Sequence, residues 1–499
     1  MSQPFQRTAD AKPGAVSLHV PRLADFKQTD RRTLISRAVV RDSVRFLDFV
    51  VAALSGAIVA MLYVPEQSVL SMNYFLAIVT VPACAVLLMQ LFGLYRVADL
   101  SRLARQLPRV VLAWSNVFAV SAVVFFLFKA GPDFSRIWMT AWFIAGGIAL
   151  LTSRIMVANV LSRWTQQGRL FRRAVVFGTG EIANDVLSEL EADLSNDLRI
   201  SGVFDERKER APDMTLGYPM LGGLDDLVNH ARNTRLDVII LAVPMAAEDR
   251  LAKIVRTLSQ LPVEIKLPAH ATPIQFAPET YSRIGNVRMI DLVEKPITAW
   301  GGVAKIVFDK FIAALALLAL APVFLATAIA IRWESKGPVF FKQKRYGFNN
   351  ELIEIFKFRS MYTDMCDQNA AKLVTKDDPR VTGIGRIIRK TSIDELPQLI
   401  NVLRGELSLV GPRPHAMSAK AGAQLYDEVV DDYFARHKVK PGITGWAQIN
   451  GWRGETDTPE KIKKRVECDI YYIENWSVLL DLYILIKTPL ALFETDNAY

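Results

Sequence analysis

The sequence predicts a membrane protein that combines α and α/β structure. It predicts four N-terminal transmembrane helices, a Rossmann-like α/β domain and a C-terminal domain anchored by a re-entrant helix. Apolar residues make up 51% of the 499 residues and gather in four long runs. Further along, short β-branched stretches alternate with amphipathic ones, and a fifth apolar run then precedes a polar segment rich in Gly, Pro and Arg. We therefore expect a tail at 1–43, a four-helix region at 44–160, an α/β domain at 171–298 and a further domain at 304–499.

The four apolar runs cover residues 44–64, 74–94, 110–128 and 137–151. Each approaches or reaches the roughly 20 residues that cross a bilayer as a helix. More than forty mostly polar residues precede the first run, which does not fit a secretory signal peptide. The tail, the second loop and the segment after the fourth run are rich in Arg, whereas the first loop has no basic residue. Because basic residues favour the cytoplasmic side, we expect the tail and everything after residue 155 in the cytoplasm.

The net charge of +9 follows from these juxtamembrane arginines, which contact anionic membrane lipids. A nucleic-acid partner is not needed to explain it, since no basic stripe with interleaved aromatic residues occurs. The three cysteines, Cys84, Cys366 and Cys468, lie far apart and form no Cys-x-x-Cys pair. Their spacing argues against a disulfide framework and a zinc site, and it fits a reducing compartment.

The middle domain shows the alternating pattern of a parallel α/β unit. Strands are expected after residue 171 and at 199–203, 237–243 and 263–267, with helices near 224–232 and 247–258. Gly178, Gly180 and Ala183 form a G-x-G-x-x-A turn, which indicates either a dinucleotide site or only a tight strand-to-helix turn. The acidic Asp205 lies far beyond the turn, and a Tyr-x-x-x-Lys pair is missing nearby. A cofactor-free regulatory or structural domain is therefore favoured.

The fifth apolar run, at 311–331, has 21 residues without a charge, which is enough to cross a bilayer. Its flanks are basic on both sides, so no charge asymmetry favours crossing. Pro322 lies in its middle and removes a helical hydrogen bond. We expect a helix at 305–332 that breaks at this proline, enters the bilayer and returns to the same face. A kinked ordinary span is the alternative that hydropathy alone favours.

Basic side chains are frequent in the C-terminal domain. Arg345 lies in a basic turn, a predicted strand at 354–361 carries Lys357 and Arg359, and Arg380 follows an acidic pair. So many cations close to one further acid pair indicate a polyanionic substrate. Contact with lipid headgroups or solvent is the alternative for part of them.

That acid pair, Asp394-Glu395, stands just ahead of a predicted helix. One interpretation is a capping box with Ser392 as the N-cap, and another has Asp394 itself as the cap with Pro397 in the first turn. Capping and catalysis are compatible, because a helix N-terminus favours both a carboxylate and a phosphate nearby. An ionised Asp is a competent nucleophile toward phosphorus, and two adjacent carboxylates can hold Mg²⁺ together with phosphate oxygens.

Three motifs carry a resemblance to a known family. KFRSM, TSIDELPQLINVLRGELSLVGPRP and VKPGITGWAQINGWRGET resemble the bacterial sugar transferases, the monotopic phosphoglycosyl transferases that act on polyprenyl phosphate. The similarity runs from about residue 304 to 488, and the four spans and α/β domain match the large members of the family. The NGWRGET stretch is most similar to undecaprenyl-phosphate glucose phosphotransferases. Glu406-Leu407 departs conservatively from the Asp-Met common there.

The resemblance implies transfer of hexose-1-phosphate from a UDP-sugar to undecaprenyl phosphate, with Mg²⁺ and release of UMP, at the start of exopolysaccharide or capsule synthesis. Glucose is favoured and galactose stays open. Asp394 would form a covalent phosphosugar intermediate, and Glu395 would help to bind Mg²⁺. Lys357, Arg359 and Arg413 would stabilise phosphate charge, with Pro412 holding the last in place. The resemblance also implies a bacterial inner membrane location, contact with membrane lipids and a catalytic domain facing the cytoplasm, and it leaves a homodimer open.

Some aromatic and titratable residues have more ordinary interpretations. An interfacial C-terminal segment is expected to hold the domain at the headgroups. Trp446 and Trp452 fit a sugar or interface region, with aromatic packing expected for at least one, and His415 and His437 fit ordinary polar roles. An alternative class is the membrane nucleotide-sugar dehydratases, which require a nicotinamide and a Tyr/Lys pair beside it; a non-catalytic scaffold is a third.

Overall fold

A computed structural model gives the structure of the protein. It describes residues 36–65, 71–100, 102–127, 134–192, 198–206, 214–244, 248–269, 281–284, 287–297, 299–363, 378–414, 420–421, 424–425, 433–452 and 458–493. Most of the predicted tail at 1–43 lies outside these residues, as does His415.

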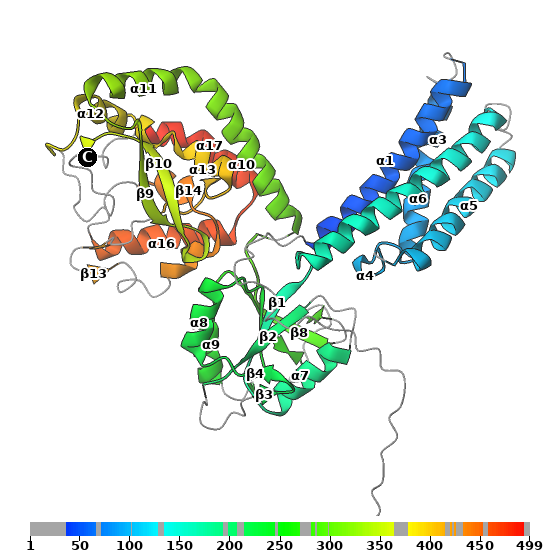
Figure 1. Cartoon of the computed structure of the whole chain (residues 1–499), viewed down its shortest axis with the longest axis horizontal. Helices are drawn as coiled ribbons and strands as arrows, with labels where there is room; N and C mark the ends of the chain where they lie inside the picture. Colours follow the sequence, from blue (N-terminus) through cyan, green and yellow to red (C-terminus); the bar gives the residue numbers. More distant parts are fainter. Residues whose placement is uncertain are drawn as a thin grey trace, which may run out of the picture. The chain divides into compact units, whose positions relative to one another are not determined.

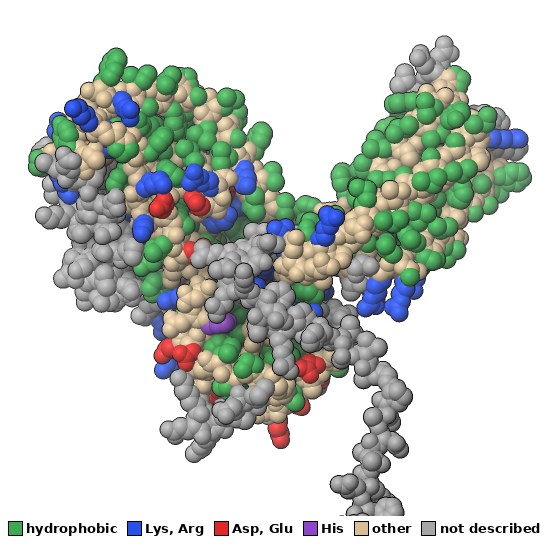
Figure 2. All heavy atoms as spheres, in the orientation of Figure 1, with side chains coloured by type: hydrophobic (Ala, Val, Ile, Leu, Met, Phe, Trp, Pro, Cys, Tyr) green, Lys and Arg blue, Asp and Glu red, His purple; other side chains and the backbone are tan. Residues whose placement is uncertain are grey.

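Four long apolar helices form the N-terminal region (Figure 1): α1 Arg37–Tyr63, α3 Met72–Leu91, α5 Leu103–Leu127 and α6 Arg136–Gln166, with the single-turn α4 Val97–Leu100. Each of the four is long and apolar enough to cross a membrane, which confirms the predicted spans. Several helices extend beyond the predicted apolar segments, because polar residues at their ends continue the helix. Hydrophobic side chains cover much of their visible surface (Figure 2), as expected of a surface that faces lipid.

The interior of this helical region holds three tryptophans and one buried charge pair. The indole N–H groups of Trp138 and Trp142 donate to backbone carbonyls of α1, at 3.0 and 2.9 Å. Arg154 of α6 contacts Asp48 of α1 at 2.6 Å, and Tyr95 donates to the same carboxylate at 2.9 Å. Charges inside a membrane region persist when they are paired in this way. The pair therefore fixes how α1 and α6 pack.

The middle domain contains one six-stranded sheet in the order β2-β1-β5-β6-β8-β7. Its elements are β1 Arg172–Phe177, α7 Glu181–Ala192, β2 Leu198–Phe204, α8 Leu224–Asn233, β5 Val238–Leu241, α9 Glu248–Leu258, β6 Glu264–Pro268, β7 Tyr281–Ile284 and β8 Val287–Val293, with the short pair β3 Met214–Thr215 and β4 Tyr218–Pro219. The predicted strands and helices are present. The four predicted strands pair in parallel, β1 with β2, β1 with β5 and β5 with β6. Two further strands extend the sheet, and β8 pairs antiparallel with both β6 and β7. Only two residues join β7 to β8, and so short a connection can link only antiparallel strands.

The sheet has helices on both faces (Figure 1). Side chains at Ala174 and Val176 of β1 pack on α7, whereas those at Val175 and Phe177 pack on α8 and α9. Successive residues of a strand point to opposite faces, so a continuous apolar strand fills both layers. This explains why the strands lack an alternating polar pattern.

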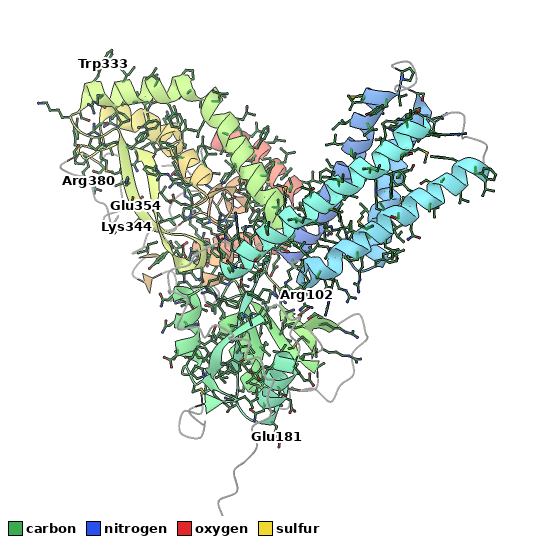
Figure 3. The ribbon with its side chains drawn as sticks, turned by 45° about the vertical axis from the view of Figure 1, so that its right-hand side comes forward. Arg102, Glu181, Trp333, Lys344, Glu354 and Arg380 are labelled. Atoms are coloured by element: carbon green, nitrogen blue, oxygen red, sulfur yellow. The ribbon has the colours of Figure 1, made fainter. Side chains whose placement is uncertain are left out.

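The C-terminal domain begins with a bent helix pair, α10 Ala299–Ala319 and α11 Ala321–Glu334. The two helices meet at an angle of 61°. Pro322 lies in the first turn of α11, where a missing N–H costs little, and the bend is at the predicted break. Apolar side chains along the pair are exposed, among them Leu318 at 76% and Trp333 at 86%. Trp333 points outward at the end of α11 in Figure 3.

The rest of this domain packs short elements against α10. These are β9 Phe340–Tyr346, β10 Leu352–Phe358, α12 Gly383–Lys390, α13 Gln398–Arg404, β11 Ser408–Val410, β12 Lys420–Ala421, β13 Gln424–Leu425, β14 Gly442–Thr444, α15 Trp446–Ile449, α16 Pro459–Glu474 and α17 Val478–Phe493, with 3₁₀ turns at Phe348–Asn350, Ile393–Glu395 and Tyr433–Lys438. β9 and β10 form an antiparallel hairpin, and β11 and β14 form a parallel pair. One apolar cluster joins α10, α13, β11, α16 and α17.

Candidate active site

The acid pair lies in the 3₁₀ turn Ile393–Glu395, between α12 and α13. Ser392 precedes it in the left-handed region at φ 57° and ψ 15°, and its side chain makes no cap. α13 begins at Gln398, with Pro397 at its N-cap position and no side-chain cap. Neither capping interpretation is therefore realised, and the two carboxylates are placed by the turn itself.

Glu395 is held by two cations from different elements. The Nζ of Lys357, on β10, donates to its Oε1 at 2.8 Å. The guanidinium of Arg413, beyond β11, donates to Oε1 at 2.7 Å and to Oε2 at 3.2 Å. Burial alone raises the pKa of Glu395, but the charges of Arg413 and Lys357 outweigh it and hold this pKa far below its usual range. Glu395 is therefore an ionised anchor for both cations.

Asp394 is the contrasting member of the pair. Within the part of the chain that the structure describes, its side chain makes no hydrogen bond or ion pair. Burial raises its pKa above the ordinary value, the charge of Lys357 opposes this, and the neighbouring Glu395 carboxylate adds to it. Arg389, at the end of α12, also lowers it. Two adjacent carboxylates with pKa values shifted in opposite directions are typical of groups with different chemical roles.

Arg413 is placed by its backbone as well as by Glu395. The carbonyl of Pro412 accepts from the N–H of Gly442 at 2.9 Å, which ties the turn after β11 back to the first residue of β14. A Cβ on Gly442 would lie 2.1 Å from the Gly411 nitrogen, so only glycine lets the two chains approach this closely. The carbonyl of Arg413 itself accepts from Arg436 at 2.8 Å. The fully buried Arg436 is paired with Asp469 of α16 at 2.6 Å.

A buried polar network fixes the last residue of β11. The Nζ of Lys305, on α10, contacts Asp481 of α17 at 2.7 Å, Asp309 at 3.1 Å and the carbonyl of Val410 at 3.1 Å. Tyr472 of α16 donates to Asp481 at 2.7 Å and lies 2.9 Å from the same carbonyl. Three helices therefore converge on the last residue of β11. Three residues further on, the chain reaches Arg413.

The structure places the other predicted phosphate ligands differently. Arg345 donates to the carbonyl of Pro414 at 3.4 Å, which puts it beside the Arg413 turn. Arg380 forms a close pair with Asp378, whose pKa it lowers to about 2. The role of Arg380 toward a substrate stays a prediction.

Arg359 has its partners at the end of α11. Its side chain is only 3% exposed and donates to the carbonyls of Lys336 at 2.7 Å and Ser335 at 2.8 Å, and to the Thr363 hydroxyl at 2.8 Å. It closes the end of α11, and its role toward a phosphate stays a prediction. The sequence places Lys357 and Arg359 on one face of a strand, but β10 ends at Phe358, so the alternation stops between them.

Two residues that the sequence does not assign belong to the site: Arg389, through its charge at Asp394, and Arg436, through the carbonyl of Arg413. Arg389 is recognisable only as one of several basic residues. Arg436 carries no local signal, because its contact lies 23 residues away in the chain.

The carboxylates fit a magnesium ion that is shared with a substrate. Asp394 has unused oxygens, while those of Glu395 hold cations. Among the described residues, no three His, Cys, Asp or Glu side chains gather as a metal site. Mg²⁺ often takes one or two carboxylates and completes its shell with water and phosphate oxygens, and this is the arrangement that the donor set allows.

Aromatic packing explains several further residues. Trp446 stacks on Tyr471 with ring centroids 5.4 Å apart, which is the predicted packing role. His437 is buried among the rings of Tyr346 and Tyr433. Burial lowers its pKa to about 3, so His437 is neutral at physiological pH.

In the middle domain, Gly178 has a structural reason of its own. It has φ +112°, and a Cβ there would lie 2.5 Å from the Ala242 carbonyl oxygen. Asp205 follows β2 directly, and the Thr179 hydroxyl donates to it at 2.6 Å. The fold therefore brings Asp205 to the turn, contrary to the distance inferred from the sequence. The packing of Gly178 agrees with the favoured role as a tight turn.

The fold and the site together define a membrane protein whose C-terminal domain carries an acid pair beside two cationic side chains. The model of the bacterial sugar transferase family matches residues 300–495, and that of a CoA-binding domain matches residues 90–269. A UDP-glucose:undecaprenyl-phosphate glucose-1-phosphate transferase of Xanthomonas campestris pv. campestris is 32% identical over 480 residues, which are 95% of this chain and 98% of that protein. The chain belongs to the bacterial sugar transferase family, as its motifs predict.

Two other relatives differ in extent. An undecaprenyl-phosphate glucose phosphotransferase of Komagataeibacter xylinus is 40% identical over 358 residues. The match covers 70% of this chain and 64% of that protein. The exopolysaccharide production protein PSS of Rhizobium leguminosarum bv. phaseoli is 50% identical over 189 residues, 38% of this chain and 94% of its own length. In that relative, the matching part makes up nearly the whole protein.

Proposed function

We propose that this protein transfers glucose-1-phosphate from UDP-glucose to undecaprenyl phosphate and releases UMP, the first step of an exopolysaccharide pathway. The observation that carries the proposal is the acid pair. Glu395 gathers Lys357 and Arg413 at one point, and it leaves the neighbouring Asp394 without a partner among the described residues. The relatives named for this reaction support the choice of substrates.

The first half of the reaction requires an ionised Asp394. One of its oxygens attacks the phosphorus that bears glucose, the bond from that phosphorus to the bridging oxygen breaks, and UMP leaves with this oxygen. The product is an acyl phosphate, a mixed anhydride that joins the Asp394 carboxyl group to glucose-1-phosphate. In the second half, a phosphate oxygen of undecaprenyl phosphate attacks the same phosphorus and Asp394 departs as a carboxylate.

The cations at Glu395 suit the charge that this chemistry carries. Lys357 and Arg413 lie within hydrogen-bonding distance of Glu395, next to the nucleophile, so a diphosphate bound at Asp394 would meet both. Mg²⁺ held by Asp394 and Glu395 would neutralise phosphate charge when it is bound. Arg345, beside the Arg413 turn, extends the cationic surface.

The proposed location is the bacterial inner membrane, with the catalytic domain at the cytoplasmic face. The bend between α10 and α11, with basic residues on both flanks, supports a hairpin that enters and leaves on one side. Such an anchor keeps the site close to the headgroup of a lipid substrate. Cysteine labelling from either side of sealed vesicles, at positions before α10 and after α11, tests it; labelling on opposite sides would establish an ordinary span.

The test of function is radiolabelled UDP-glucose incubated with undecaprenyl phosphate and Mg²⁺. We expect label in the lipid, loss of transfer by about a thousandfold or more in Asp394→Asn, and loss on chelation. Competition with unlabelled UDP-galactose decides the alternative donor. Undiminished transfer by Asp394→Asn would exclude the proposed nucleophile. A nicotinamide-dependent dehydratase is disfavoured, because it requires a Tyr-x-x-x-Lys pair beside the nicotinamide. Such a pair, Tyr483 and Lys487, lies on α17 of the C-terminal domain and not in the α/β domain.

A further inference from the structure

The buried amide of Asn401 joins β10 to α13. Asn401 lies in α13 and is 0% exposed. Its Oδ1 accepts from the backbone N–H of Phe356 at 3.0 Å, and its Nδ2 donates to the carbonyl of Glu354 at 2.7 Å. The same Nδ2 also donates to the carboxylate of Glu406 at 2.6 Å.

These contacts take the place of a third strand. The hairpin sheet has two strands, so β9 covers one edge of β10. In a parallel pair, one residue of the neighbouring strand bonds to a carbonyl and to the N–H two residues further along. The Asn401 amide makes the same two bonds, to the carbonyl of Glu354 and the N–H of Phe356. Buried peptide groups without partners are costly, and Asn401 satisfies two of them on an edge that has no strand.

The position of this contact connects it to the acid pair. Lys357 directly follows Phe356 on β10, and its Nζ reaches Glu395 at 2.8 Å. On the other side, α13 begins at Gln398, three residues after Glu395. Asn401 therefore fixes the two segments that meet in this ion pair. A slip of β10 by one residue would turn Lys357 to the opposite face of the hairpin.

We propose that Asn401 is a positioning residue of the transferase, which holds Lys357 against Glu395 by locking the register between β10 and α13. Glu406 assists by accepting from Nδ2, which sets the direction of the amide. The inference rests on the proposed function, because it concerns the residues that surround Asp394.

The main test is Asn401→Leu, which keeps the approximate volume and removes every side-chain hydrogen bond. We expect kcat to fall by about 10- to 100-fold, because small displacements of catalytic groups have effects of this size. The KM for UDP-glucose should change by less than about threefold. Glu354→Gln is the matched control, because its exposed side chain pairs with the exposed Lys342 and its backbone carbonyl is unchanged. This control should keep full activity.

A double-variant cycle separates positioning from a general loss of structure. If Asn401 acts through Lys357, adding Asn401→Leu to a Lys357→Met enzyme should reduce kcat by less than about threefold. The same loss in both backgrounds would overturn the proposal.

A second pair of variants covers the case in which Asn401→Leu does not fold. Asn401→Asp keeps the acceptor for Phe356 but faces Glu406, and adding Glu406→Gln restores a donor between the two side chains. Recovery of at least about fivefold in kcat supports the proposal, whereas a double variant no better than Asn401→Asp would count against it. Wild-type enzyme in the same assay separates failure of the Asn401 inference from failure of the proposed function. Absence of transfer by the wild-type enzyme would refute the proposed function itself.

Discussion

At the scale of single residues, the site depends on two neighbouring carboxylates with different surroundings. Glu395 has Lys357 and Arg413 at hydrogen-bond distance, whereas Asp394 has burial without a partner among the described side chains. The pKa of Glu395 is lowered and that of Asp394 is raised. The local sequence does not distinguish the two residues, since both are acids in one turn. Their division of roles comes from residues 18 and 38 positions away from Glu395.

The raised pKa of Asp394 predicts an acid limb in the first half-reaction. Only the carboxylate attacks, so release of UMP in the absence of lipid should fall as pH drops through this raised pKa, at a higher pH than an ordinary Asp would give. Lys357→Met should move the limb to still higher pH, because it removes the main charge that lowers the pKa. Rapid-quench measurement of UMP against pH checks this. Lys342→Met on the same hairpin is the control, and a limb that does not move in Lys357→Met would contradict the assignment.

Ser392 gives a second prediction at this scale. Its left-handed backbone at φ 57° turns the chain into the acid pair, and a residue branched at Cβ is strained there by about 1–2 kcal/mol. Ser392→Val should lower the midpoint of thermal unfolding and reduce kcat, whereas Ser392→Gly should retain the fold. Unfolding and turnover of both variants are the measurement. Equal behaviour of Val and Gly would show that the backbone conformation does not matter.

At the scale of elements, the site depends on how β11 is fixed. Lys305 of α10 and Tyr472 of α16 both donate to the carbonyl of Val410, and Asp481 of α17 accepts from both side chains. All three side chains are buried, so each is satisfied only while the other elements are in place. The packing of the bent helix pair and the position of the Arg413 turn are therefore linked through one strand.

Asp481→Ala should destabilise this domain strongly. It leaves the buried Lys305 charge with a single carboxylate neighbour, and removing one partner of a buried pair typically costs about 3–5 kcal/mol. Glu354→Ala removes an ion pair whose side chains are more than half exposed, and it should cost less than about 1 kcal/mol. Denaturant-induced unfolding in detergent compares the free energies of unfolding of the two variants. Similar losses would mean that the network does not hold β11.

At the scale of the whole molecule, the chain combines three regions that follow different rules. The four helices turn apolar residues toward lipid, the middle sheet buries apolar strands on both faces, and the C-terminal domain exposes apolar side chains on the bent pair. Each of the described residues in the proposed site belongs to the last region. The relative from Rhizobium leguminosarum bv. phaseoli matches 38% of this chain over 94% of its own length.

This arrangement predicts that residues 296–499 function without the rest of the chain. The fragment contains the bent anchor and every site residue, so it should sediment with membranes and transfer label at a rate within about tenfold of the full chain. Flotation and the lipid-transfer assay measure the two properties, and the Asp394→Asn fragment is the control. A membrane-bound, folded fragment without activity would show that the other regions are required for catalysis.

The sequence by itself determined the spans, the break at Pro322, the main strands and the acid pair. Each of these depends on composition or periodicity within a few turns of chain. Tertiary structure alone decided that Lys357 and Arg413 meet Glu395, that Arg359 closes α11 and that β8 runs antiparallel to its neighbours β6 and β7. It also decided that Asn401 completes the edge of β10. The physical reason is that a side chain's partner depends on distance in space, and residues 38 to 47 positions apart leave no periodic trace in the chain.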